Sequence, residues 1–186
     1  MPHELWLVRH GPTEWSENGR HTSVTDLPLL PHGEELARTL AEPLAQQDFA
    51  LVLTSPRQRA RRTAELAGFA HAEPDEDLVE WAYGDYEGVT TPEIRETVPD
   101  WTVWTHPCPG GETADEVGAR LDRIVARAEH AEGRTLVFAH GHSLRVLTAR
   151  WLGLPVVDGR LFRLDTATVS VLGHERENPV VLRWNS

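Results

Sequence analysis

The sequence contains no lysine, and all 18 of its basic residues other than histidine are arginines. A GC-rich genome would account for this composition, but the chemical consequence is the same whatever its origin. Without lysine, the chain has no side-chain amine for a Schiff base and no lysine for a Walker P-loop. Phosphate recognition, if the protein has it, must use arginine, histidine and the N-termini of helices.

Cysteine and long apolar runs are also scarce. The one cysteine, Cys108, cannot form a disulfide within the chain, and the default expectation is a cytoplasmic setting. The N-terminus lacks the pattern of a signal peptide, and no apolar run reaches the roughly 18 residues of a membrane span. The net charge of −11 argues against partners such as nucleic acids or anionic membranes. We expect a single soluble domain over residues 1–186.

Short apolar runs alternate along the chain with segments of helical spacing. The predicted strands are 4–8, 49–53, 135–139, 168–172 and 180–184. The predicted helices are 33–47, 56–67, 115–130 and 143–151. Pro43 should kink or shorten the first of these helices, and Ser55 is the expected N-cap of the second. This alternation predicts an α/β fold, a three-layer α/β/α sandwich with a mostly parallel central sheet.

Polar segments follow directly after three of the predicted strands. They are residues 9–11, 55–62 and 140–143, which are rich in arginine, serine and histidine. Ligand sites in open α/β sheets lie just beyond the carboxyl ends of the strands. We therefore expect these three segments to converge on one crevice, although they are far apart in the sequence.

Four motifs in and around these segments together resemble a known family. They are RHG at 9–11, SPRQRARRTA at 55–64, LVEWAYGDYEG at 78–88 and HGHS at 140–143. In this combination the chain is similar to the histidine phosphatase superfamily, the phosphoglycerate-mutase-like enzymes, from Leu5 to about Leu152. The segments 13–22 and 81–104 resemble most the actinobacterial broad-specificity acid phosphatases and the yeast-type sugar bisphosphatases of this family.

The resemblance implies a role for five residues. His10 becomes phosphorylated, Glu80 is the proton donor, and the rest of the phosphate pocket is made by Arg9, Arg59 and His140. Elementary chemistry agrees with these roles, because a neutral imidazole is not repelled by a phosphate ester and guanidinium groups neutralise the transferring oxygens. Glu87 is the alternative acid, but the motif match favours Glu80. The expected mechanism is two in-line displacements, in which His10 takes the phosphoryl group and water removes it.

Six further residues are expected on the substrate side of the pocket: Ser16, Thr22, Ser23, Tyr83, Gly141 and His142. Ser16 stands where the family usually has asparagine, and Ser23 where its mutases commonly have glycine. His21 is the histidine expected to line the entrance. Trp101 and Trp104 either cap the site or pack in the core or in a dimer interface.

The pair His140-x-His142 also fits part of a metal site. Two histidines need further ligands, and the sequence has no HxxxH, CxxC or carboxylate-rich loop to supply them. We therefore expect neither a catalytic metal nor another cofactor. Whether the chain forms a homodimer is left open by the sequence.

Hydrolysis of a small-molecule phosphate ester is the predicted activity. Its nearest rival is phosphoglycerate mutase, which shares the phosphohistidine but returns the phosphoryl group to a sugar acid. Mutases of this family carry a longer, more basic insertion after the glutamate motif, whereas here Arg95 and His106 are the basic residues between Gly88 and Gly111. This short segment favours an open, water-accessible site and hydrolysis. An inactive module that binds phosphoesters or proteins is the second alternative, disfavoured because every expected catalytic residue is present.

Overall fold

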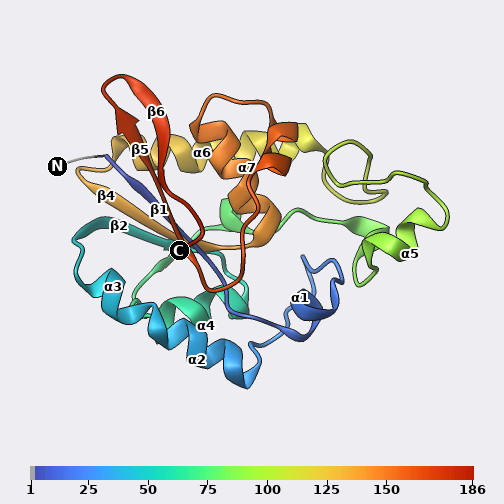
Figure 1. Ribbon diagram of the computed structural model, residues 1–186, viewed down its shortest axis with the longest axis horizontal. Helices are drawn as coiled ribbons and strands as arrows, with labels where there is room; N and C mark the ends of the chain where they lie inside the picture. The colour runs from blue at the N-terminus through green and yellow to red at the C-terminus, as the bar shows by residue number, and fades with distance from the viewer. Residues whose placement is uncertain (1–2) are drawn as a thin grey trace.

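All six strands belong to one mixed sheet in the computed structural model, which describes residues 3–186 (Figure 1). The strands are β1 (Leu5–Arg9), β2 (Phe49–Thr54), β3 (Glu73–Pro74), β4 (Arg134–Ala139), β5 (Val169–Glu175) and β6 (Asn178–Arg183). Their order across the sheet is β3-β2-β4-β1-β5-β6. The first four in this order are parallel, and the hairpin β5–β6 adds two antiparallel strands at one edge. The predicted mostly parallel sheet is confirmed.

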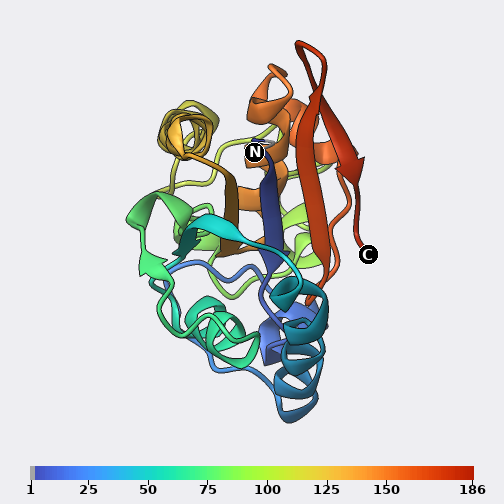
Figure 2. The ribbon, with the colours of Figure 1, turned by 90° about the vertical axis from the view of Figure 1, so that its left-hand side faces the viewer.

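Helices cover both faces of the sheet (Figures 1 and 2). The long helices on one face are α6 (Ala114–His130) and α7 (Gly141–Trp151), and those on the other are α2 (Pro31–Thr39), α3 (Ala41–Ala45) and α4 (Gln58–Leu66). The smaller elements are α1 (Glu14–Asn18), α5 (Thr91–Arg95) and the 3₁₀ turns η1 (Glu76–Leu78), η2 (Gly84–Tyr86) and η3 (Val156–Leu161). The three-layer α/β/α arrangement is therefore also as predicted.

The side chains of β1 show how the sheet divides the core in two. Leu5 and Leu7 pack with residues of α6 and α7, whereas Trp6 and Val8 pack with Leu40 and with residues of α3 and α4. Successive side chains of a strand point to opposite faces, so a continuous apolar run is required when both faces are covered. Full burial of one such leucine stabilises the fold by about 1.5–3 kcal/mol.

Two helices replace the single one predicted at 33–47. Helix α2 begins at Pro31 and ends at Thr39, and the chain turns at Leu40 before α3 begins. Pro43 shortens the helical run as expected, but it lies inside the first turn of α3, where its missing N–H has no helical partner to lose. On α2, Leu36 is exposed and Ala37 is buried.

The start of α4 differs from the prediction as well. The helix begins at Gln58 with Arg57 as N-cap residue, so Ser55 does not cap it. The Ser55 hydroxyl instead accepts a 3.3 Å hydrogen bond from the Arg57 N–H and lies 2.7 Å from Nε2 of His140. The Ser55 side chain, which follows β2, is thus bonded to His140 after β4 and does not cap α4.

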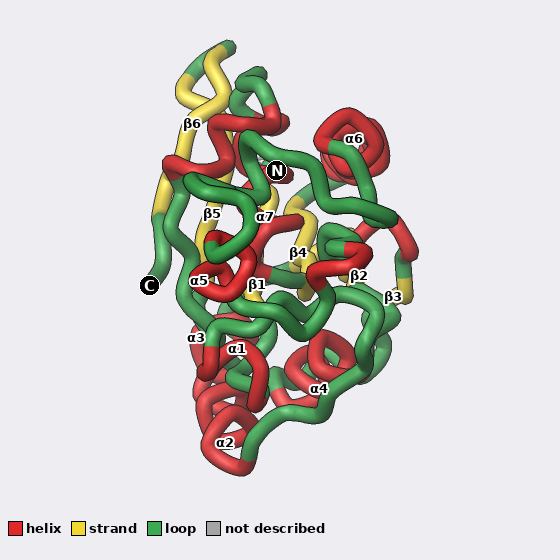
Figure 3. Tube along the Cα trace, turned by 90° about the vertical axis from the view of Figure 1, so that its right-hand side faces the viewer, coloured by secondary structure: helices red, strands yellow, loops and turns green. Residues whose placement is uncertain are grey.

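Strand register brings the three polar segments to one edge of the sheet. Arg9 pairs with Ala139, and the N–H groups of His10 and Ser55 donate to the carbonyls of Ala139 and Phe138. Figure 3 shows this edge, where loops, α1 and α5 lie in front of the strand ends. Across residues 3–186 the structure has no helix that combines the length and the apolar character needed to cross a membrane.

Candidate active site

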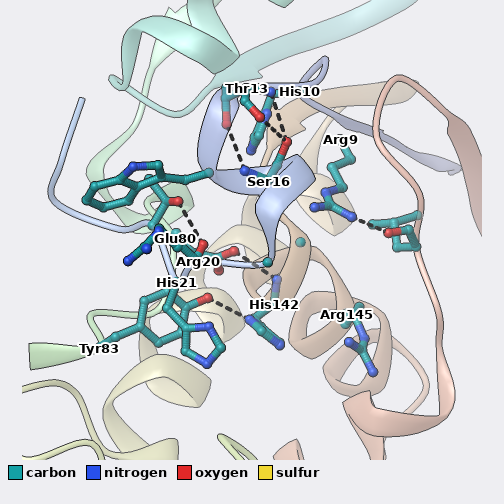
Figure 4. Close-up of a pocket in the computed structure, with 15 residues that line it drawn as sticks. Arg9, His10, Thr13, Ser16, Arg20, His21, Glu80, Tyr83, His142 and Arg145 are labelled. Carbon is teal, nitrogen blue, oxygen red and sulfur yellow. Dashed lines mark hydrogen bonds between the residues drawn. The ribbon is translucent and has the colours of Figure 1, made fainter. Parts of the chain in front are cut away.

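A pocket of about 260 Å³ opens at the carboxyl ends of β1 and β4. Its walls come from residues 9–10, the segment 13–22, the loop that carries Glu80 and Tyr83, and the first turn of α7 (Figure 4). The structure thus brings residues that are far apart in the sequence to one cavity. We call the buried residues His10, Arg59 and His140 the buried end of the site, and the more accessible Arg20, His21 and Arg145 its open end.

His10 is held in a defined tautomer. Its Nδ1 lies 2.7 Å from the carbonyl oxygen of Gly11, and because a carbonyl only accepts, Nδ1 carries the hydrogen and Nε2 keeps its lone pair. Burial lowers the pKa of His10 well below its usual range, and the cations of Arg59 and Arg9 lower it further. The ring is therefore neutral, which is the state that a nucleophilic imidazole requires.

Arg9 lies on the pocket wall with hydrogen-bonding capacity to spare. Its Nη1 donates to the carbonyl of Leu164, whereas its buried Nε has no hydrogen-bond partner within residues 3–186. A Cβ placed on Gly141 would lie 3.3 Å from Cζ of Arg9, so this glycine leaves room for the guanidinium against the start of α7. An unsatisfied buried donor of positive charge marks a place where an anion can bind.

Arg59 and His140 contact each other behind His10. The Arg59 Nε donates to Nδ1 of His140 over 3.2 Å, and the rings of His140 and His10 lie 5.2 Å apart. Both residues are fully buried and are not on the pocket wall. Because Nδ1 of His140 accepts, its hydrogen is on Nε2 and is donated to Ser55, and burial lowers the pKa of His140 well below its usual range. His140 is neutral in this state.

Glu80 lies on the pocket wall at the N-terminus of α7. Its Oε1 accepts from the N–H groups of Trp81 (2.9 Å) and Ser143 (2.8 Å), and its Oε2 accepts from that of His142 (3.0 Å). These bonds fix the carboxyl group beside the first turn of the helix, where the helix dipole also favours an acidic group. Glu87, the alternative acid, does not line the pocket and is bound to Ser23 and Thr25.

Five of the six expected substrate-side residues line the pocket, namely Ser16, Thr22, Tyr83, Gly141 and His142. Ser23 does not, because its hydroxyl is buried against Glu87. Burial raises the pKa of Tyr83 well above its usual range and lowers that of His142, so a neutral phenol and a neutral imidazole share the 2.6 Å hydrogen bond between the Tyr83 hydroxyl and Nδ1 of His142 (Figure 4). The Ser16 hydroxyl forms a capping box with Thr13 at the start of α1.

Two arginines of the open end were missed by sequence reasoning. Arg145 donates to the carbonyls of Gly159 and Arg160, and its guanidinium lies 4.7 Å from the ring centroid of Trp104. Arg20 donates to the carbonyl of Gly88. Helical spacing could have found Arg145, because it follows His142 by three residues and so lies on the same face of α7. Arg20 is on an irregular segment and had no comparable signal.

The two tryptophans lie behind the pocket wall and do not cap it. Trp101 is buried and packs on the ring of His21, and Trp104 packs on that of His142. His21 lines the pocket, as the sequence predicted for the entrance. Trp101 is therefore part of the core, whereas Trp104 is partly buried against it.

The histidine pair 140 and 142 is engaged with protein groups. His140 contacts Arg59 and Ser55, and His142 contacts Tyr83. Over residues 3–186 no three or more histidine, cysteine, aspartate or glutamate side chains are grouped so that they could hold a metal ion.

Comparison with known proteins assigns the family. The model of the histidine phosphatase superfamily (branch 1) matches residues 5–186, and the chain belongs to this superfamily. The identification from the motifs is confirmed, and the match extends beyond Leu152 to the last residue.

The relatives include named phosphatases. The chain is 45% identical over 177 residues to an acid phosphatase of Mycobacterium tuberculosis, covering 93% of this chain and 87% of that protein. It is 40% identical over 183 residues to sedoheptulose 1,7-bisphosphatase of Saccharomyces cerevisiae, covering 81% of this chain and 68% of that one. The structure matches that of the product of the open reading frame Rv3214 of Mycobacterium tuberculosis with a TM-score of 0.94 and 41% identity, covering 98% and 97% of the two chains.

Proposed function

We propose that the protein hydrolyses phosphomonoesters of small metabolites through a phosphohistidine intermediate on His10, with Glu80 as proton donor. The observation that supports this most directly is the tautomer of His10. A neutral, buried imidazole with Nε2 free lies beside the unpaired Nε of Arg9, in the cavity that also contains Glu80. This combines a nucleophile, an anion-binding donor and an acid in one pocket.

The first step forms the bond between Nε2 of His10 and phosphorus and breaks the bond from phosphorus to the ester oxygen. Glu80 carries a proton at this stage and gives it to the leaving oxygen. Arg9 and Arg59 neutralise charge on the transferring oxygens, and the phosphoryl group takes the place of the Arg59–His140 hydrogen bond at the buried end. In the second step the water oxygen bonds to phosphorus as the bond from phosphorus to Nε2 breaks, and the water gives a proton to the Glu80 carboxylate; this releases phosphate and restores both residues.

The open end supports a preference among esters. Arg20 and Arg145 add two guanidinium groups to the pocket wall outside the buried end. Each has donors that an anion can share, so esters with a second anionic group, such as sugar bisphosphates, are the favoured class. One of the relatives is named as such a bisphosphatase.

The test is the chemical nature of the intermediate. Brief exposure to a ³²P-labelled ester followed by quenching should leave one acid-labile, alkali-stable label, which is located on His10 by peptide mapping. His10→Ala should carry no label and lose turnover while it keeps its circular dichroism spectrum. Label on serine, or no label on the unmodified protein, would contradict the mechanism. Phosphate release measured against interconversion of 3- and 2-phosphoglycerate separates the hydrolase from the mutase.

A further inference from the structure

The loop 22–25 links a carboxylate outside the pocket to an arginine at its buried end. We propose that Glu87 is a positioning residue for Arg59: it holds this loop so that the loop carbonyls orient the guanidinium toward the phosphoryl site. This inference rests on the proposed function, because it assumes that Arg59 binds the phosphoryl group. Glu87 would then serve the reaction without touching the substrate.

One side of the loop is held by Glu87. The carboxylate accepts from the N–H of Ser23 (2.9 and 3.0 Å), from the N–H of Thr25 (3.0 Å) and from the Ser23 hydroxyl. Burial alone would raise the pKa of Glu87, but these hydrogen bonds outweigh it and the pKa is lowered. The group is therefore an ionised acceptor, and bonds of this charge-assisted kind are the strong ones.

The other side of the loop holds Arg59. Its Nη1 donates to the carbonyl of Thr25 (3.0 Å), and its Nη2 donates to those of Thr22 (3.3 Å) and Ser23 (3.2 Å). The ion pair with Asp26 spans 4.0 Å, and that carboxylate is 43% exposed, so it orients the guanidinium weakly. Backbone carbonyls thus set the direction of Arg59, and its Nε contacts His140 at the buried end.

Glu87 is itself fixed by the backbone that follows it. The N–H of Gly88 donates to the carbonyl of His21, and the N–H of His21 donates to that of Val89. A Cβ on Gly88 would lie 2.9 Å from the ring of Trp15, and its φ is +76°, so glycine is required at this turn. The segment 87–89 is therefore held in place by these contacts. Its first residue, Glu87, in turn holds the loop 22–25 that binds Arg59.

The first arm of the test compares two carboxylates with the same kind of bonding. Glu87→Gln keeps the size of the side chain but replaces an acceptor oxygen by a donor that faces N–H groups. We expect kcat/KM to fall by about ten- to a hundredfold, with weaker competitive inhibition by inorganic phosphate. The control is Glu116→Gln, because Glu116 also accepts an N–H (2.8 Å) and a hydroxyl (2.9 Å), both from Thr113, but it lies in the capping box of α6. This variant should stay within about twofold in kcat/KM.

The second arm is a double-mutant cycle with Arg59→Lys, which removes the guanidinium that Glu87 is said to orient. In that background Glu87→Gln should lower kcat/KM by less than about twofold, because a residue that acts through Arg59 has nothing left to position. Multiplicative losses would overturn the inference and leave the proposed function intact. Full activity of Arg59→Lys alone would also overturn the inference, because the guanidinium would then have no role for Glu87 to support, but it would not contradict the phosphohistidine on His10. If Glu87→Gln does not fold, Ser23→Ala, which removes one of the bonds, replaces it in the same cycle and should show the same non-additivity.

Discussion

The buried end and the open end of the site are built in different ways. At the buried end, His10 and His140 follow directly after the central strands β1 and β4, and their ring nitrogens contact Gly11 and Ser55, which lie just beyond strand ends. At the open end, Arg20 and His21 come from an irregular segment, and Arg145 extends from α7. Strand ends thus place His10 and His140, whereas an irregular segment and a helix side chain form the open end. Chemistry and selectivity can change independently in such a site.

The largest expected effect on kcat is at Glu80, which lies between the buried end and the open end of the site. Glu80→Gln should lower kcat for an alkyl phosphate by about 10²–10⁴-fold, because the leaving alkoxide must be protonated. For nitrophenyl phosphate, whose leaving group needs no proton, the loss should be much smaller. Steady-state kinetics on the two esters with the same preparation supplies its own control. Equal losses on both would mean that Glu80 supports the pocket and does not donate the proton.

A smaller effect is expected at the open end. Arg145→Gln should raise KM for a sugar bisphosphate by about tenfold, equivalent to ~1.4 kcal/mol, with kcat nearly unchanged. KM for a monophosphate without a second anionic group should stay the same. Arg160→Gln on η3 is the matched control, because its side chain is exposed and does not line the pocket. A loss of kcat on both esters would place Arg145 with the reacting groups and so remove the distinction between the ends.

The smallest effect concerns stability, and it arises from the histidines of the site. Burial lowers the pKa values of His10, His140 and His142 well below the value of about 6.5 expected in the unfolded chain. Below that pH the unfolded state binds protons that the folded state does not, so the free energy of unfolding should fall as the pH decreases. Urea denaturation at pH 7.5 and 5.5 measures this, and His142→Gln should reduce the difference. A midpoint that does not change with pH would contradict the neutral state of these rings.

Much of the buried end could be predicted from the sequence, since it depends on short-range signals. Apolar runs such as 4–8 and 135–139 can only be buried strands, and the polar residues after them must meet at one edge. The motif match then supplied the grouping of His10, Arg9 and Glu80 that the cavity contains. These predictions depend on which residues follow each strand, and they hold even when the predicted bounds of the strand are wrong by one or two residues.

The remaining features depend on contacts between distant segments. Ser55 looked like a helix cap, but its hydroxyl is bonded to His140, which is 85 positions away. Ser23 was expected to face the substrate, yet the carboxylate of Glu87 turns it inward. The choice of such distant hydrogen-bond partners leaves no pattern in the neighbouring sequence.

The central position of β1 has a consequence for how the enzyme is made. This strand leaves the ribosome well before the two neighbours that it pairs with, β4 and β5, which come much later in the chain. The backbone groups of β1 therefore have no final hydrogen-bond partners until β4 and β5 have been made. Strand pairing between segments so far apart in the sequence is slow to form. The hydrogen bond from Arg9 to the carbonyl of Leu164 also forms only after that later residue has been made. A ribosome-bound fragment that ends before β4 would contain His10 but not the residues of α7 that line the pocket, so no catalytic activity is expected before these later segments have been added.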